Sequence, residues 1–141
     1  MTPNAPTLYT RLHDWQPRYE AFVRARLSAP FAWGGNDCCT FAADGVQAIT
    51  GIDPAPHLRA HRDARGALLT MRGCGGIAKL AIACMGPAQP ATRAAVGDMV
   101  LLPMGKRLAL GLCNGSTAFG PSAHGLAHVA MADALLCWRL V

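Results

Sequence analysis

The sequence predicts an α+β fold in which N-terminal helices pack on one face of a small, mainly antiparallel β-sheet. Three observations support this prediction. Apolar residues recur at helical spacing up to Gly86, the composition changes there, and short apolar segments bounded by turn residues follow from Met99 onward. The chain has 141 residues, 52% of them hydrophobic and 15% charged, so it is expected to form one folded domain over residues 1–141.

The helical half is expected to span residues 13–86, after an arm over residues 1–12 that is predicted to be flexible. Within this half, one helix is expected to begin near Cys38, after the turn sequence "GGND", and to stop at Gly51. Cys38 and the residues that follow it by 3, 4, 7, 8 and 11 positions lie on one face of this helix and form a continuous apolar stripe. The other predicted helices cover residues 17–27, 63–72 and 76–85.

The β half is expected to span residues 97–141, after a stretch with two prolines, "GPAQPATRAAVGD", that is typical of a linker. The sequences "NGST" and "GPSAHG", which separate apolar segments, are typical of hairpins and loops. The predicted strands cover residues 99–102, 108–113, 117–119, 126–131 and 136–141.

The charge pattern argues against a nucleic-acid partner. The formal net charge is +5, but the basic residues are scattered and form no run of about five or more like charges. The N-terminal sequence "MTPNAPTLYTRLHDW" lacks the basic and then apolar pattern of a signal peptide, so the protein is expected to be made in the bacterial cytoplasm without one. No apolar run reaches the roughly 18 residues of a membrane span, so no span is predicted.

The six cysteines lie at positions 38, 39, 74, 84, 113 and 137. A chain of this length can build a core without disulfides, and three of the cysteines lie inside apolar runs, where a thiol behaves as a small hydrophobic group. A metal site needs ligands at short spacings, and the one close pair, Cys38 and Cys39, would point in directions about 100° apart on a helix. The sequence therefore predicts no metal ion and no other cofactor.

Cys38 is the candidate nucleophile of the chain. It falls in the first turn of its predicted helix, where unpaired backbone N–H groups and the helix dipole stabilise a thiolate and lower the pKa of the thiol. The carboxylate of Asp37 opposes this effect unless it turns away to cap the helix. The local sequence therefore predicts that Cys38 can be activated.

Several motifs, in a fixed order, resemble a known family. The sequence W-G-G-x-D-C that opens the helix at Cys38, followed by Gly-Asp in "VGDMVLL", resembles the NlpC/P60 cysteine peptidases, a papain-like family that cuts peptide bonds in bacterial cell walls. The fuller set, with F-x-W-G-x-N-D-C-C, "GIDP" and a terminal Trp-Arg, is similar to a group of phage and prophage proteins encoded among tail genes. The resemblance covers most of residues 12–141 and implies a papain-like fold.

The resemblance also implies the site residues. Cys38 is the expected nucleophile, because the family's cysteine directly follows an Asp. The family's general base is a His in an H-V-G-like strand, and matching its Gly to Gly111 puts Ala109 at that position. His128, in "AHVAMA", is the best remaining candidate for the base, ahead of His13, His57, His61 and His124. The residues expected to line the site are Trp33, Gly35, Asp37 and Cys39.

Two functions remain open at this point. With Ala109 at the base position, the chain is expected to be a phage tail-tip or tail-assembly component with an NlpC/P60-like fold and no catalysis, located in the virion tail among other tail proteins. The alternative is an active tail-associated endopeptidase or amidase that hydrolyses peptidoglycan peptides, with Cys38 as nucleophile and His128 as base. That enzyme needs an imidazole within about 3–4 Å of the Cys38 sulfur.

Overall fold

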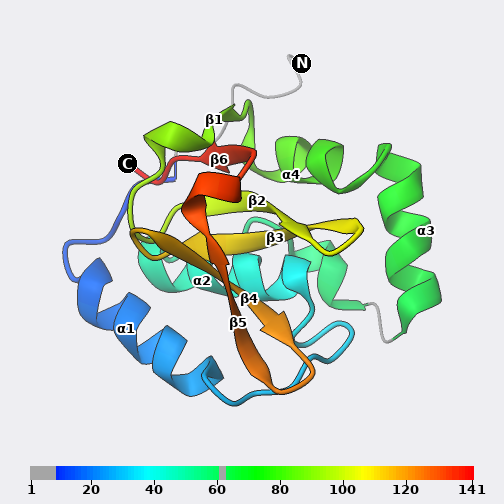
Figure 1. Ribbon diagram of the computed structural model, residues 1–141, viewed down its shortest axis with the longest axis horizontal. Helices are drawn as coiled ribbons and strands as arrows, with labels where there is room; N and C mark the ends of the chain where they lie inside the picture. The colour runs from blue at the N-terminus through cyan, green and yellow to red at the C-terminus, as the bar shows by residue number, and fades with distance from the viewer. Residues whose placement is uncertain (1–8, 61–62) are drawn as a thin grey trace.

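The helices and the main strands occupy separate halves of the chain, as the sequence predicted (Figure 1). The computed structural model describes residues 9–60 and 63–141, and over these ranges it is a mixed α+β fold. The helices are α1 (Trp15–Arg26), α2 (Cys38–Thr50), α3 (Ala64–Cys74) and α4 (Ile77–Met85). The strands are β1 (Gln89–Pro90), β2 (Met99–Met104), β3 (Arg107–Cys113), β4 (Thr117–Ser122), β5 (Gly125–Ala130) and β6 (Leu136–Trp138). Short 3-10 helices are η1 (Pro56–Ala60), η2 (Ala91–Arg93) and η3 (Met131–Asp133).

The six strands form one antiparallel sheet with the order β1-β6-β2-β3-β4-β5. The C-terminal strand β6 lies between β1 and β2, so it is paired on both sides. β3 pairs with β2 over residues 107–112, but it pairs with β4 only at Leu112 and Cys113. Because β4 diverges from β3 beyond that point, the edge of β3 over residues 107–111 is open on one side, and the cavity described below lies beside this edge.

α2 packs against β3 and β4 and lies behind the sheet in the view of Figure 1. Phe41 and Ile49 are fully buried on the predicted apolar stripe, and they share one hydrophobic cluster with Leu112 of β3. Burial of each such side chain contributes about 1.5–3 kcal/mol to folding. Gly45 permits the close approach of helix and strand, because a Cβ at this position would collide with the Leu112 side chain.

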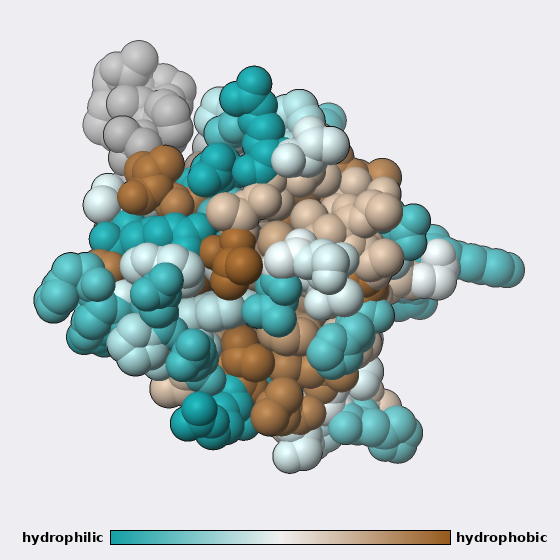
Figure 2. Space-filling model, turned by 60° about the vertical axis from the view of Figure 1, so that its left-hand side comes forward, coloured by the Kyte–Doolittle hydropathy of each residue, from teal (hydrophilic) through white to brown (hydrophobic). Residues whose placement is uncertain are grey.

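α1 packs beside α2 and leaves its polar side chains exposed except that of Arg26, which is partly buried. Tyr19 is its buried residue, and the Tyr19 hydroxyl donates to the backbone carbonyl of Cys113 at 3.1 Å. Figure 2 shows one face of the molecule, on which strongly hydrophobic residues form several separate groups interrupted by hydrophilic ones. Scattered groups of this kind are ordinary for a protein surface.

Asp98, just before β2, is fully buried and fastens three parts of the chain together. Its carboxylate pairs with Arg11 at 2.8 Å and with Arg139 at 2.6 Å. It also accepts the backbone N–H groups of Ala95 and Leu140. A buried carboxylate is stable only where charges and hydrogen bonds replace its lost hydration. This Asp98 cluster of Arg11, Asp98 and Arg139 therefore holds the N-terminal segment, the entry to β2 and the C-terminal segment in one arrangement.

The end of the predicted flexible arm is docked on the domain. Residues 1–8 lie outside the described residues, but Tyr9 is buried and its hydroxyl donates to the carbonyl of Cys84 at 3.0 Å. Arg11 belongs to the Asp98 cluster and stacks over the ring of Trp15. The prediction was wrong for residues 9–12 because their partners are distant in the sequence, and no local pattern announces them.

The stretch after Gly86 carries more structure than the linker that the sequence predicted. It contains η2 and the short strand β1, which pairs with β6 through Gln89 and Cys137. Pro90 has no N–H to donate, and an edge strand is where a sheet tolerates it. β4 also extends to Ser122, beyond the predicted end at Phe119.

The described helices are short. The longest of them, α2, has 13 residues, whereas a membrane-spanning helix needs about 20. Over the described ranges, no helix combines the length and the apolar character needed to cross a membrane.

Replacement of Asp98 by Asn is expected to destabilise the fold by about 3 kcal/mol or more, because it leaves Arg11 and Arg139 without their buried countercharge. Chemical or thermal denaturation followed by circular dichroism measures the loss. Asp133→Asn is the control, because Asp133 is exposed. A loss for Asp98→Asn as small as that of the control would contradict the role given to the Asp98 cluster.

Candidate functional site

The loop before α2 places Cys38 at the N-terminus of the helix, as predicted. Asp37 occupies the N-cap position, and its carboxylate accepts the N–H of Thr40 at 2.8 Å. The Thr40 hydroxyl accepts the N–H of Asp37 at 2.9 Å, which completes a capping box. The second carboxylate oxygen of Asp37 accepts the N–H of Gly34 at 2.9 Å. Both oxygens of Asp37 are therefore used to fix the loop and the helix end.

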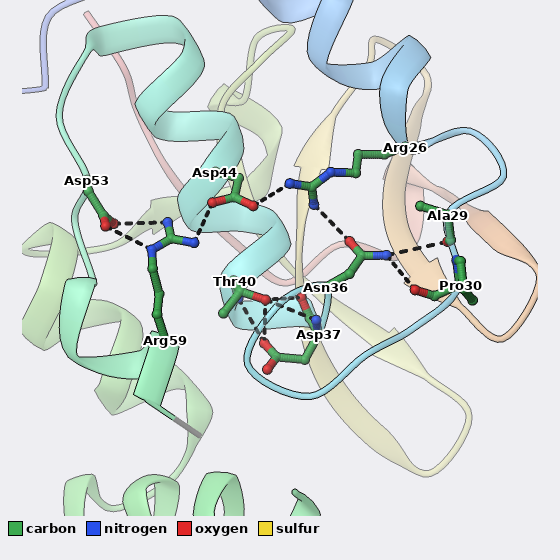
Figure 3. A network of polar contacts seen from close by, with 9 residues as sticks. All are labelled: Arg26, Ala29, Pro30, Asn36, Asp37, Thr40, Asp44, Asp53 and Arg59. Atoms are coloured by element: carbon green, nitrogen blue, oxygen red, sulfur yellow. Dashed lines mark hydrogen bonds and ion pairs between the residues drawn. The ribbon is translucent and has the colours of Figure 1, made fainter. Parts of the chain in front are cut away.

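A chain of ion pairs and hydrogen bonds holds this loop against α2 (Figure 3). Asp44, on α2, pairs with Arg26 at 2.5 Å and with Arg59 at 2.6 Å. Arg26 also donates to the side chain of Asn36 at 2.9 Å, and the Asn36 amide donates to the carbonyl of Pro30. The position of the candidate nucleophile thus depends on α1, η1 and the loop together. We call this set the Asp44 network: Arg26, Asn36, Asp44, Asp53 and Arg59.

Cys38 lines a cavity of about 280 Å³ between the start of α2, α4 and the hairpin of β2 and β3. We call it the Cys38 cavity. Its wall is almost wholly apolar, and the polar side chains that reach it besides the two thiols are Asp37 and Arg107. Its apolar lining includes Phe31, Trp33, Leu58, Ile77, Leu80 and Pro121. A small, mainly apolar cavity with few polar groups is typical of a ligand site.

The surroundings of Cys38 lower the pKa of its thiol. The first cause is the neighbouring thiol of Cys39, whose sulfur lies 3.9 Å from the Cys38 sulfur and donates to the thiolate. The backbone N–H groups of Leu110 and Cys39 add to the effect, while burial and the Asp37 carboxylate oppose it. The same thiol contact, together with burial, raises the pKa of Cys39. The negative charge therefore rests on Cys38, which makes it the nucleophile of the pair.

The structure brings most of the predicted site residues together. Trp33, Asp37 and Cys39 line the cavity with Cys38. Gly35 does not line it, because it is exposed in the preceding turn, where its N–H donates to the carbonyl of Ala32 at 3.2 Å.

The strand position that the resemblance assigns to the general base also reaches the cavity. Ala109 is part of its wall, at the open edge of β3. The pairing of Ala109 with Leu102 places its Cβ on the sheet face away from α2, whereas Leu108 lies on the same side as Leu110. Neither side chain can accept a proton, so β3 offers the thiol no base.

His128 does not supply the base in this structure. It is exposed on β5, the edge strand at the far end of the sheet, and its ring meets the Phe119 ring edge-on with centroids 4.9 Å apart. It is not part of the wall of the Cys38 cavity, so the expected pair of Cys38 and His128 is not formed. The other histidines are His13, His57 and His124, all exposed and away from this wall, and His61, which lies outside the described residues.

The two adjacent thiols lie closer than their spacing on a helix suggested. Within residues 9–60 and 63–141, however, no group of three His, Cys, Asp or Glu side chains could hold a metal ion. The arrangement therefore offers the chemistry of a stabilised thiolate, which attacks electrophilic carbon.

Sequence reasoning missed the part of the cavity that comes from α4 and η1. Ile77, Leu80 and Leu58 have the signal of ordinary core residues, and Leu80 and Leu58 are indeed buried. Only the packing of α4 and η1 beside the start of α2 makes them site residues. The N–H of Leu110, which reaches the Cys38 sulfur, has no sequence signal at all.

The fold and the capped thiol define an α+β domain built around a cysteine site. A sequence profile described as "Domain of unknown function (DUF6950)" matches residues 10–140. Because this match covers nearly the whole chain, the protein belongs to that family. Comparison with curated proteins finds no match. The description of this family assigns no function, and support for one comes from the site.

Replacement of Cys39 by Ala is expected to raise the pKa of Cys38, because it removes the thiol that donates to the Cys38 thiolate. Cys39→Ser keeps a donor at this position and is expected to keep the pKa of Cys38 low. The rate of iodoacetamide alkylation of Cys38 against pH, read by peptide mass spectrometry, measures both. Equal pH profiles for the Ala and Ser variants would show that the Cys39 side chain does not activate Cys38.

Proposed function

We propose that this protein is a papain-like domain of the NlpC/P60 type that keeps a thiol site but no longer cleaves peptides, and that it serves as a phage tail-tip or tail-assembly component. The observation that carries the loss of cleavage is the wall of the Cys38 cavity. Among the residues described, this wall presents no imidazole to the sulfur, and Ala109 stands where the resemblance places the base.

Cleavage of a peptide by a thiol needs two proton transfers. The thiol must lose a proton, and the amine that leaves must gain one. The Cys39 thiol and the backbone N–H groups at Cys38 lower the pKa of its thiol, which makes the first transfer easier. The described wall does not meet the second need. The Asp37 carboxylate is held by the N–H groups of Gly34 and Thr40, and the contact with Cys38 together with burial raises the pKa of Cys39, so this thiol keeps its proton. The guanidinium of Arg107 does not give up a proton in proteins. A tetrahedral intermediate would therefore expel the thiolate and return to the peptide.

The tail role is supported by the order of motifs that resembles phage and prophage proteins encoded among tail genes. The observed α+β order, with the cysteine at a helix N-terminus before the strands, is compatible with that resemblance. On this proposal the protein resides in the virion tail, and its partners are other tail proteins.

The purified protein is expected to release no product from peptidoglycan peptides beyond that of Cys38→Ala. Liquid chromatography with mass spectrometry of the peptides measures this. A His introduced on β3, in Ala109→His and separately in Leu108→His, tests whether the base is the missing part. At whichever position reaches the sulfur, cleavage is expected to appear and to depend on Cys38, because a general base contributes about 10²–10⁴-fold.

Cleavage by the wild-type protein that disappears in Cys38→Ala would refute the proposed loss of catalysis and favour the tail-associated hydrolase. The variants His128→Ala and His61→Ala would then identify the base. Cys39→Ser serves as the matched control, because it changes the adjacent residue and leaves the nucleophile in place.

The tail role predicts where the protein is found. Mass spectrometry of tails purified from induced phage particles is expected to detect it, or else deletion of its gene is expected to yield heads without tails. Intact, infectious particles from the deletion strain, with the protein missing from wild-type particles, would contradict both the tail-tip and the assembly role.

A further inference from the structure

The Cys38 cavity is shaped for an apolar ligand rather than for a peptide. Its wall joins aromatic and aliphatic side chains from the loop before α2, from η1, α3 and α4, and from strands β2, β3 and β4. Leu58 and Leu80 are almost completely buried there. No row of polar side chains lines it that could pair with the amides of a peptide, since the polar groups of the described wall are Asp37, Arg107 and the two thiols. A flexible hydrocarbon chain needs no such partners.

Two large apolar side chains of the wall remain open to solvent. Trp33 is 37% exposed and Leu108 is 44% exposed, although both line the cavity. Trp33 is held in place by edge-on packing against Phe31, with ring centroids 4.6 Å apart. A ligand that filled the cavity would remove these surfaces from water, which favours an apolar occupant.

The reactive group and the charged group of the wall differ in exposure. Cys38 is partly buried in the wall, whereas Arg107 is exposed at the start of β3. An apolar chain in the cavity would thus bring its reactive carbonyl to the sulfur, and Arg107 could bind an anionic group that stays in water. An acyl thioester on a phosphate-bearing carrier combines these features.

We propose that Cys38 accepts an acyl group from an acyl thioester and that the acyl chain then lies in the Cys38 cavity. This inference rests on the proposed loss of peptide cleavage. Without a proton donor for the leaving group, the thiolate can displace a thiolate but not an amine. An amine needs a proton to leave, whereas the sulfur of the carrier leaves as a thiolate, because the pKa of a free thiol is about 8.5.

The step balances without an oxidant or a base. The Cys38 thiolate attacks the thioester carbonyl, a new carbon–sulfur bond forms, and the bond to the carrier sulfur breaks with its electron pair. The carrier thiolate takes a proton from water. The N–H of Cys38, at the N-terminus of α2, can donate to the carbonyl oxygen as it gains charge, because Asp37 caps the N–H of Thr40 and not this one.

The test is acylation of the full chain by octanoyl-N-acetylcysteamine and by acetyl-N-acetylcysteamine, followed by intact and peptide mass spectrometry. The octanoyl group is expected on Cys38, at a rate about tenfold or more above that of the acetyl group, because only the longer chain fills the apolar cavity. Cys38→Ala is expected to remove the adduct. Octanoyl-coenzyme A is expected to react more slowly with Arg107→Ala than with the wild type, while the neutral octanoyl thioester reacts equally with both.

Leu108→Gln places an uncharged polar group in the exposed part of the wall and is expected to slow octanoyl transfer about tenfold, because the acyl chain loses apolar contact while no charge is added near the thiol. Leu135→Gln is the matched control, because Leu135 is 50% exposed and does not line the cavity. The circular dichroism spectrum and the thermal unfolding midpoint of Leu108→Gln, compared with those of the wild type, show whether the variant is folded.

Equal octanoyl and acetyl rates, or no octanoyl adduct on a Cys38 that iodoacetamide alkylates, would overturn the inference. Neither result would touch the proposed function, which fails only if peptides are cleaved or the tail role is refuted. If octanoyl-coenzyme A reacted with Arg107→Ala at the wild-type rate, Arg107 would not bind an anionic carrier, and that part of the proposal would be wrong.

Discussion

The buried carboxylate of Asp98 is the constraint on which the rest of the structure depends. It is fully buried, and two arginines from opposite ends of the described chain replace its hydration. Arg11 also donates to the carbonyls of Val96 and Leu140, so the turn into β2 and the C-terminal segment are held by the same side chain. Gly97 makes this turn possible with a φ of +93°, which other residues rarely adopt. Every residue of β2 pairs with β3, so the turn into β2 also fixes the position of the β3 edge that reaches Cys38.

A second layer of contacts fixes the thiol itself. The capping box of Asp37 and Thr40 sets the start of α2, and the Asp44 network holds the preceding loop against the same helix. The carboxylate of Asp37 has two opposing effects, since it stabilises the helix end while its charge raises the pKa of Cys38. The Cys39 thiol and the Leu110 N–H outweigh that charge. Among the described residues, hydrogen bonds stabilise the thiolate, and no imidazole lines the site to form an ion pair with it.

At this site the stabilisation of a thiolate is separate from acid–base catalysis, which favours acyl transfer from a thioester over peptide cleavage. A peptidase thiol and its imidazole share one proton, and the imidazole returns it to the leaving amine. In the Cys38 cavity the thiolate stands against hydrocarbon walls, with Arg107 as the charged group at the exposed end. On our proposal, such surroundings select a ligand by chain length and not by peptide sequence, because apolar contact carries little directional information.

The sequence by itself determined the fold class and the helix at Cys38, with a capping residue in the "GGND" turn before it. These depend on local rules, since apolar periodicity and capping act between residues a few positions apart. The docking of Tyr9 and Arg11 was decided by the tertiary structure, as were the insertion of β6 between β1 and β2 and the separation of His128 from Cys38. Each of these joins segments far apart in the sequence. The sequence also did not reveal the apolar wall of the cavity. A leucine that lines a site and a leucine that fills a core have the same local sequence pattern, and only the packing distinguishes them.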